Sequence, residues 1–194
     1  MKHGLLTDCK TVILVNGIPA SGKSTVTREL SSSLGAPSLT IDGIKEPFMA
    51  TFETIDRPFN RKLGCAAYEV IWSIIAQAPA NCVWIVDAWF GFQPKDALLR
   101  FLQQAGVERV LEVWNQISPE LAVSRYALRL DARKMGHPGE EYLPELAQLA
   151  SRAKPMMIGP VYHLHQDQLP ADFTRLTAWV KEHITEGQPA LITP

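Results

Sequence analysis

Residues 12–25 read VILVNGIPASGKST, an apolar and largely β-branched run that breaks into glycines and ends on a lysine and two hydroxyl residues. Gly17, Gly22, Lys23 and Ser24 match the pattern GxxxxGK[ST], which binds phosphate when it joins a strand to a helix. The apolar run predicts the strand, and the residues that follow have a helical pattern. The stretch therefore predicts a phosphate-binding loop in its required context.

The chemistry of this loop predicts a nucleoside triphosphate as its ligand. Its glycines allow backbone amides to approach phosphate oxygens, and the positive end of the following helix points to the same place. Lys23 would contact the β- and γ-phosphates, and the Ser24 hydroxyl would bind Mg²⁺. The alternative is a glycine-rich turn that only connects two elements. The residues expected at the nucleotide are Gly17, Ile18, Pro19, Ala20, Ser21, Gly22, Lys23, Ser24 and Thr25.

Length and composition limit the possible class of protein. The chain has 194 residues, 46% of them hydrophobic, so it can bury a core as one domain spanning residues 1–194. A formal net charge of -1 gives no general attraction to nucleic acid or to an anionic membrane. The three cysteines lack CxxC spacing, and no apolar run is long enough to span a bilayer. We expect a soluble, cytoplasmic protein without nucleic-acid or membrane partners; its oligomeric state is open.

Strand-like and helix-like segments alternate along the whole chain, which predicts an α/β fold with a parallel sheet and helices on both faces. A tail after Gly187 is expected to be frayed. The expected strands are residues 11–16, 38–41, 82–87, 108–114 and 160–165. The expected helices are residues 22–34, 60–78, 94–105, 118–134, 141–153 and 171–184.

Two aspartates stand just after strands, where ligands bind in such sheets. Asp42 is either the base that takes a proton from an acceptor hydroxyl or the N-cap of a helix beginning at Gly43. Asp87 ends the third strand, where a carboxylate would hold Mg²⁺ through water or orient a substrate. The alternative for Asp87 is a polar residue that only ends the strand.

Arg125, Arg129 and Arg133 recur every four residues, so a helix over 118–134 would carry all three on one face. Such a face is either a solvated stripe or a clamp for transferring phosphates, and the phosphate loop favours the clamp. The Gly- and Pro-containing stretch that follows, residues 133–140, predicts a turn between helices. We therefore expect a lid at about residues 125–145, in which His137 contacts a phosphate or base, or is only a turn residue.

Aromatic residues gather near the expected acceptor side. Trp89 and Phe90, with Phe48 and Phe52, are candidates for an apolar wall against a ring or a sugar face. Trp72 is expected in the core. His163 and His165 alternate on the last strand, and with no carboxylate or cysteine spacing nearby they are expected to be sheet residues, not metal ligands.

Four segments together resemble the small P-loop phosphotransferases of the chloramphenicol phosphotransferase and zeta-toxin type. These are VILVNGIPASGKST, LTIDGIKEPF, VWIVDAWFGF and PVYHLH, and RKMGHPGEEY is similar to the lid of related small-molecule kinases. The resemblance runs from Thr11 to Ile184. It implies a P-loop kinase-like three-layer α/β/α fold with a five-stranded parallel sheet and a helical lid. It also implies ATP with Mg²⁺ as donor, and Asp42 as the residue that activates an acceptor hydroxyl.

One position departs from the pattern of the chloramphenicol enzymes. Those enzymes carry adjacent acidic residues after the third strand, whereas Asp87 is followed here by Ala88. A second carboxylate at this point is therefore missing from the expected site.

The expected function is ATP-dependent transfer of the γ-phosphate to a hydroxyl of a small molecule, such as a sugar derivative or an antibiotic-like acceptor. Lys23 would hold the phosphates with its ammonium facing solvent in the empty protein, Asp42 would act as the base, and Arg125 would contact the nucleotide. Arg129 and Arg133 would neutralise charge on the transferring group. The alternatives are a nucleotide or nucleoside kinase, and a switch that binds NTP without small-molecule turnover.

Overall fold

The computed structural model describes residues 7–168 and 172–185, so the expected frayed tail after Gly187 lies outside the described residues. Five strands form one sheet, and every neighbouring pair is parallel, in the order β2-β3-β1-β4-β5. The expected five-stranded parallel sheet is confirmed. The strands are β1 (Thr11–Asn16), β2 (Ser38–Thr40), β3 (Val83–Ala88), β4 (Arg109–Gln116) and β5 (Val161–His165).

Helices connect successive strands, as parallel pairing requires. Three short 3₁₀ turns, η1 (Phe90–Phe92), η2 (Leu130–Ala132) and η3 (Glu140–Tyr142), lie between them. The helices are α1 (Lys23–Leu34), α2 (Ile41–Met49), α3 (Arg57–Ala76), α4 (Lys95–Gln104), α5 (Pro119–Ala127), α6 (Leu143–Arg152) and α7 (Phe173–Thr185).

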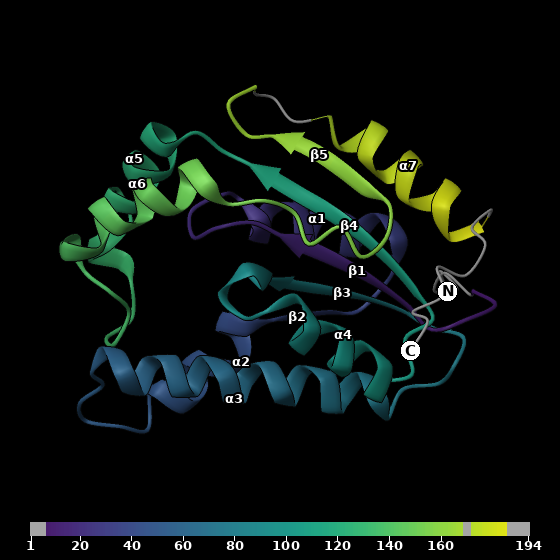
Figure 1. Cartoon of the computed structure of the whole chain (residues 1–194), viewed down its shortest axis with the longest axis horizontal. Coiled ribbons are helices and arrows are strands. Elements are labelled where there is room, and N and C mark those ends of the chain that lie inside the picture. The colour runs from purple at the N-terminus through teal and green to yellow at the C-terminus, as the bar shows by residue number, and fades with distance from the viewer. Residues whose placement is uncertain (1–6, 169–171, 186–194) are drawn as a thin grey trace.

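The central strand β1 is buried on both faces, which is why its sequence is apolar throughout rather than alternating. Ile13 and Val15 pack with α1 and α7 on one face. Val12 and Leu14 pack with α3 and α4 on the other, where Trp72 is buried as expected. Figure 1 shows α7 on one side of the sheet and α3 on the opposite side. The expected three-layer arrangement is confirmed.

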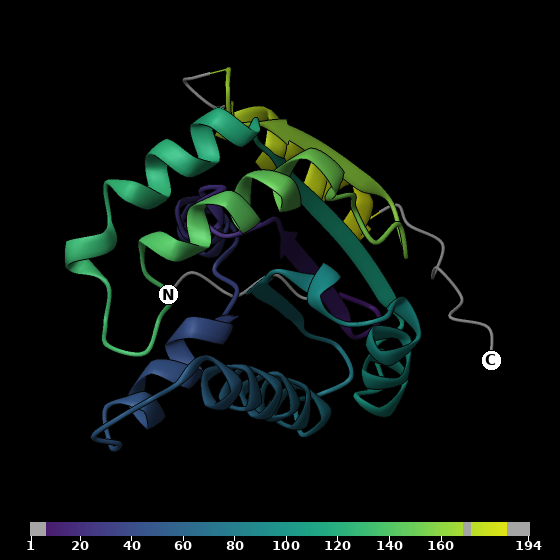
Figure 2. The same ribbon diagram turned by 60° about the vertical axis from the view of Figure 1, so that its left-hand side comes forward.

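Helices α5 and α6 form a third packed unit beyond the sheet. Tyr126 and Leu146 are buried between them, together with Ile18 of the phosphate-binding loop. The segment that joins α5 to α6 runs from this unit toward α2 and α3 (Figures 1 and 2). This segment lies within residues 125–145, the range of the expected lid, and is called the lid.

The prediction of one helix over residues 118–134 is wrong. Helix α5 ends at Ala127, and the chain continues through Arg129, outside helical geometry at φ -111° and ψ 0°, into the 3₁₀ turn η2. The turn returns the Arg133 guanidinium to 4.4 Å from the centre of the Tyr126 ring. A straight helix would set these residues two turns, about 10 Å, apart. Tertiary contact therefore overrides the four-residue spacing, and the lid is not one continuous helix.

A buried carboxylate links the central strands to the loop before β5. Glu112 on β4 is fully buried and accepts hydrogen bonds from the Asn16 amide at 2.7 Å and from the backbone N–H groups of Met156 and Met157 at 2.9 Å. Asn16 in turn accepts from the Phe90 N–H at 3.1 Å. The network fixes the chain that leaves β3 against the end of β1, at the edge of the sheet where the candidate site lies.

Candidate active site

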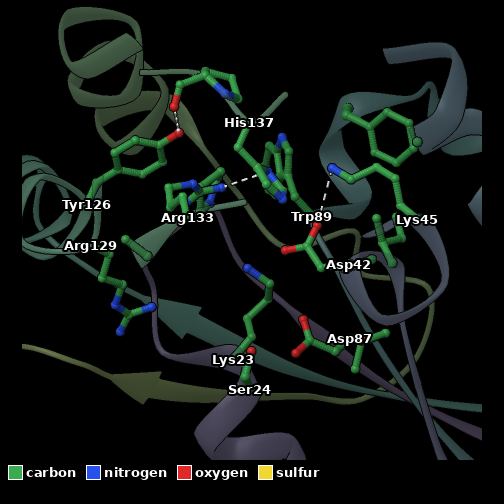
Figure 3. Close-up of a pocket in the computed structure, with 18 of the residues that line it drawn as sticks. Lys23, Ser24, Asp42, Lys45, Asp87, Trp89, Tyr126, Arg129, Arg133 and His137 are labelled. Atoms are coloured by element: carbon green, nitrogen blue, oxygen red, sulfur yellow. Dashed lines mark hydrogen bonds and ion pairs between the residues drawn. The ribbon is translucent and has the colours of Figure 1, made fainter. Parts of the chain in front are cut away.

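A cavity of about 330 Å³ lies at the carboxyl ends of β1, β2 and β3, beneath the lid (Figure 3). It is where a parallel α/β sheet places ligands. Four of the predicted residues, Gly17, Ile18, Ser21 and Arg125, do not line it. The predicted residues that line it are Pro19, Ala20, Gly22, Lys23, Ser24, Thr25, Asp42, Asp87, Trp89, Arg129, Arg133 and His137.

The phosphate-binding loop leaves the start of α1 open to an anion. Gly22 is the N-cap of α1 at φ 80°, a left-handed conformation that suits glycine. No side chain caps this end of the helix, and its first turn contains no acidic residue. A side chain at Gly17 would come within 2.4 Å of the Ser21 hydroxyl oxygen, so that position also requires glycine. The backbone amides at the start of α1 remain available for phosphate.

Lys23 bends back onto its own loop, so the expectation that its ammonium faces solvent is wrong. The half-buried side chain donates a 2.9 Å hydrogen bond to the Ile18 carbonyl oxygen. Burial lowers the pKa of Lys23, Asp87 and Asp42 act against this, and Arg129 and Arg133 add to it. Burial is thus the main cause of the lowered pKa of Lys23, and a bound phosphate would stabilise its charged form.

Asp87 is buried at the end of β3, beside the start of α1. Burial raises the pKa of its carboxyl; Lys23 and hydrogen bonds from Ser24 and Thr27 oppose the rise, and Asp42 adds to it. The Thr27 hydroxyl lies 3.4 Å from it. A buried carboxylate beside a serine hydroxyl is the oxygen-donor set that Mg²⁺ prefers. Ser24 and Asp87 thus fit the predicted magnesium role.

Asp42 lines the cavity, and the Lys23 side chain of the loop points toward it (Figure 3); Asp42 is not the N-cap of α2. The helix starts at Ile41, and its N-cap is Thr40, whose hydroxyl accepts from the Gly43 N–H at 2.8 Å. A β-region threonine ending a strand competes well for this position, so the helix begins earlier than Gly43. The carboxylate of Asp42 is left open to the cavity, with 61% of its side chain exposed.

The charge on Asp42 is maintained by its neighbours. Burial tends to raise the pKa of this carboxyl, but its charged neighbours, Lys45 foremost, outweigh that tendency and hold the pKa below its ordinary value. The Lys45 ammonium lies 3.3 Å away on α2. An ionised carboxylate that faces an open cavity can orient and deprotonate a hydroxyl.

The three arginines are separated by the break after α5. Arg129 is exposed and Arg133 is half-buried, and both line the cavity. Arg125 instead donates from Nη1 to the Gln166 side-chain oxygen at 3.1 Å and from Nη2 to the Gln166 carbonyl oxygen at 3.4 Å. Gln166 packs against Gly22. Arg125 thus contacts the phosphate-binding loop indirectly, through Gln166, and does not line the cavity.

The turn of the lid is held by residues from three other elements. The Tyr126 hydroxyl of α5 donates to the Pro138 carbonyl oxygen at 2.8 Å, and the Asn60 amide of α3 donates to the Gly136 carbonyl oxygen. Glu46 of α2 forms an ion pair of 2.8 Å with Lys134. The lid turn therefore rests on the helices that form the far wall of the cavity.

The aromatic wall differs from the expected one. Trp89 lines the cavity, but Phe90 is fully buried in the core beside Tyr68. Phe48 and Phe52 lie outside the cavity and are 52% and 41% exposed. Their side chains project from the outer part of α2 and the loop after it. Phe92, which the sequence analysis did not select, lines the cavity beside Trp89.

Lys45, Asn60 and Glu46 were also missed. Lys45 and Glu46 lie three and four residues after Asp42, a spacing that places them near it on a helix and that could have identified them. Asn60 has no such signal, because only the fold brings α3 beneath the lid. His163 and His165 lie on β5, as expected.

No family model matches the chain, and no curated protein matches it. Among solved structures, a "putative kinase" from Chloroflexus aurantiacus J-10-fl is similar over 92% of this chain and 100% of its own, with a TM-score of 0.76 and 22% identity. A shikimate kinase from Bacteroides thetaiotaomicron covers 88% of this chain and 98% of its own, with a TM-score of 0.54 and 18% identity.

A sugar kinase from Janibacter sp. HTCC2649 is similar over 96% of this chain and 99% of its own, with a TM-score of 0.51 and 17% identity. At these identities the likeness shows the fold alone. The chain has the fold of the P-loop small-molecule kinases, as its sequence predicts. Among the described residues, 7–168 and 172–185, no helix combines the length and apolarity needed to cross a bilayer.

Proposed function

We propose that this protein is an ATP-dependent phosphotransferase that moves the γ-phosphate to a hydroxyl group of a small molecule. One observation carries the proposal: Lys23 of the phosphate-binding loop and the ionised Asp42 line the same cavity. A donor and an acceptor can therefore meet in one cavity, which is the main requirement for phosphoryl transfer.

The donor end holds the triphosphate. Backbone amides at the start of α1 bind the β-phosphate, and Lys23 turns from the Ile18 carbonyl oxygen to the β- and γ-phosphates. Ser24 and Asp87 would hold Mg²⁺, whose charge helps to neutralise the phosphates. These contacts fix the γ-phosphate at the centre of the cavity.

At the acceptor end, Asp42 accepts a hydrogen bond from the acceptor hydroxyl and aims its oxygen at the γ-phosphorus. The new O–P bond forms as the bond from the γ-phosphorus to the β,γ-bridging oxygen breaks. ADP leaves with that electron pair, and the hydroxyl proton passes to Asp42. Arg129 and Arg133 line the cavity on the side of the lid and stabilise the charge on the transferring group.

The walls near Asp42 support a small, partly polar acceptor. Trp89 and Phe92 present aromatic surface, while Lys45 and Asn60 present polar groups. This combination suits a ring or sugar face that carries hydroxyls, as in a sugar derivative or an antibiotic-like compound. A volume of about 330 Å³ is at the lower end of small-molecule sites.

The test is turnover of MgATP with a panel of hydroxylated compounds, such as sugars, cyclic polyols, nucleosides and hydroxylated antibiotics, with the products analysed by mass spectrometry. We expect one class to gain a phosphate while ATP becomes ADP. Lys23→Ala should abolish transfer, and Asp42→Asn should lower it by about 10² to 10⁴. Lys62→Ala, an exposed lysine on α3, is the matched control and should transfer phosphate normally.

Two outcomes would replace the proposal. Phosphorylation confined to nucleosides or nucleotides would make the protein a nucleoside or nucleotide kinase. Tight ATP binding without transfer to any compound would instead favour a nucleotide-dependent switch.

A further inference from the structure

His137 links the lid to α2 through both of its ring nitrogens. Its Nδ1 lies 3.0 Å from Arg133 Nη2, and its Nε2 lies 3.1 Å from Glu46 Oε1. The imidazole is only 5% exposed. Glu46 also pairs through Oε2 with Lys134 at 2.8 Å. A continuous chain of contacts therefore runs from a carboxylate on α2 to an arginine that lines the cavity.

The partners determine which nitrogen carries the proton. Arginine can only donate, so Nδ1 must accept from Arg133, and the single proton of the neutral ring stays on Nε2 and is donated to Glu46. Burial, then Lys45 on α2, lowers the pKa of His137; Arg133 adds to this, while Asp42 and the Glu46 hydrogen bond oppose it. From α3 the uncharged Asn60 reaches the same turn. The ring is therefore neutral near pH 7.

This arrangement holds the arginine without neutralising it. Arg133 has no ion-pair partner among the described carboxylates, and its Nε is buried without a hydrogen-bond partner. Its guanidinium lies over the Tyr126 ring at 4.4 Å and bonds to a neutral imidazole. A direct ion pair between Arg133 and Glu46 would cancel much of the charge of the guanidinium. The neutral His137 ring between them fixes the orientation of Arg133 without neutralising it, so the guanidinium can still bind a phosphate.

We propose that His137 and Glu46 are positioning residues that hold the Arg133 guanidinium toward the phosphate-binding loop. The catalytic consequence rests on the proposed function, but the contact chain does not. The ligand atoms of Asp42, Glu46 and His137 lie within 4.8 Å of one another, and both ring nitrogens of His137 are hydrogen-bonded in this structure, to Arg133 and to Glu46. Arg133 placement thus depends on α2, the helix that carries the proposed base.

The first test is independent of activity. In ¹⁵N spectra of labelled histidine, the His137 ring, assigned by its loss in His137→Asn, should show a protonated Nε2 and an unprotonated Nδ1 at pH 7. Arg133→Ala, which removes the donor to Nδ1, should mix the two tautomers, whereas Lys134→Gln, which removes the other partner of Glu46, should leave them unchanged. A protonated Nδ1, or a ring charged at pH 7, overturns the proposal whatever the protein catalyses.

The second test uses hydrolysis of MgATP without acceptor, since the acceptor is unidentified. Asparagine can place an oxygen where Nδ1 stood and still accept from Arg133, whereas glutamine reaches Glu46 but offers nothing at Nδ1. We expect His137→Gln and Glu46→Ala to lower kcat by about 10- to 100-fold with KM for ATP unchanged, and His137→Asn to lose less. Lys62→Gln, at an exposed position on α3, is the control that keeps wild-type values.

The two kinds of failure are distinguishable. If wild-type protein hydrolyses ATP and His137→Gln matches it in kcat, the positioning role is wrong. If His137→Asn and His137→Gln fall equally in kcat, KM and melting temperature together, the histidine is only structural and the proposal is also wrong. If wild-type protein neither hydrolyses ATP nor phosphorylates any compound of the panel, the proposed function fails, and the tautomer measurement still decides whether His137 holds Arg133.

Discussion

The Asp42 carboxylate and the Lys45 ammonium lie 3.3 Å apart, one helical turn from each other on α2. Lys45 is buried and also donates to the Asn60 side chain at 3.4 Å, so its position is fixed from two sides. The proposed base therefore has a permanent cation beside it, and this pair sets the pH range in which the base is charged.

Lys45→Met should move the acid limb of the pH profile of kcat to higher pH. Surrounding protein raises the pKa of Asp42, and the neighbouring cations lower it to below its ordinary value. Removal of Lys45 lets the pKa rise, so Asp42 is protonated, and turnover lost, at a higher pH than in the wild type. Lys62→Met removes an exposed charge from α3 and should leave the limb in place; identical profiles for all three proteins would contradict Asp42 as the base.

Replacement of Arg125 and replacement of Arg129 should have different effects on stability and activity. Arg129→Ala removes an exposed side chain from the cavity wall, so we expect an unchanged melting temperature and a kcat about 10²-fold lower, with Arg133 still present. Arg125→Ala breaks two contacts to Gln166 behind the phosphate-binding loop and should cost about 1–3 kcal/mol of stability as well as activity. Thermal unfolding and steady-state kinetics separate the two; equal behaviour would refute the division.

Gly64→Ala should stabilise the protein while weakening acceptor binding. Gly64 lies inside α3 and lines the cavity, and a methyl group there would meet nothing within 4 Å. Alanine in a helix interior is about 0.5–1 kcal/mol better than glycine, but its methyl would occupy space meant for the acceptor. The melting temperature should rise and KM for the acceptor should increase.

Ser73→Ala, at an exposed position on the same helix, is the matched control for helix propensity. It should raise the melting temperature without changing KM. An unchanged KM in Gly64→Ala as well would mean that the acceptor binds elsewhere.

Glu112→Gln should destabilise the fold by about 1–3 kcal/mol. The carboxylate accepts from Asn16 and from two backbone N–H groups, and an amide nitrogen in its place would face one of these donors with another donor. Chemical denaturation measures the loss. Glu108→Gln, an exposed neighbour before β4, should be neutral, and a neutral Glu112→Gln would show that the network contributes little.

The parts that were predictable from sequence are those encoded locally. The phosphate-binding loop is one contiguous motif, and its strand and helix flank it directly, so Lys23 and Ser24 are placed by spacing alone. The doubly covered sheet follows from apolar strands that alternate with helices. Asp42 is found because the carboxyl ends of parallel strands meet at one edge of a sheet.

The parts that failed depend on contacts between distant segments. Arg133 leaves the predicted helix face because the chain turns after Ala127, and Asn60 of α3 and Glu46 of α2 hold that turn from elsewhere in the sequence. Phe90 turns into the core because Asn16 holds its backbone N–H against β1. Hydrophobic and charge periodicity describes one helix or strand at a time. It could not show whether a side chain lies at the cavity or packs elsewhere, because that depends on the neighbouring elements.

The turn at Gly136 connects the lid to the cavity wall formed by α2 and α3. Its φ of 91° and the 2.8 Å approach that a side chain would make to Ile55 leave room only for glycine, and Asn60, a residue of the acceptor wall, binds its carbonyl oxygen. Substitutions in the wall formed by α2 and α3 would therefore also disturb the contacts that hold the lid turn. Changes intended to alter the proposed acceptor preference should therefore be made in the lid turn and in the α2–α3 wall together, because a change in one alone would break contacts with the other.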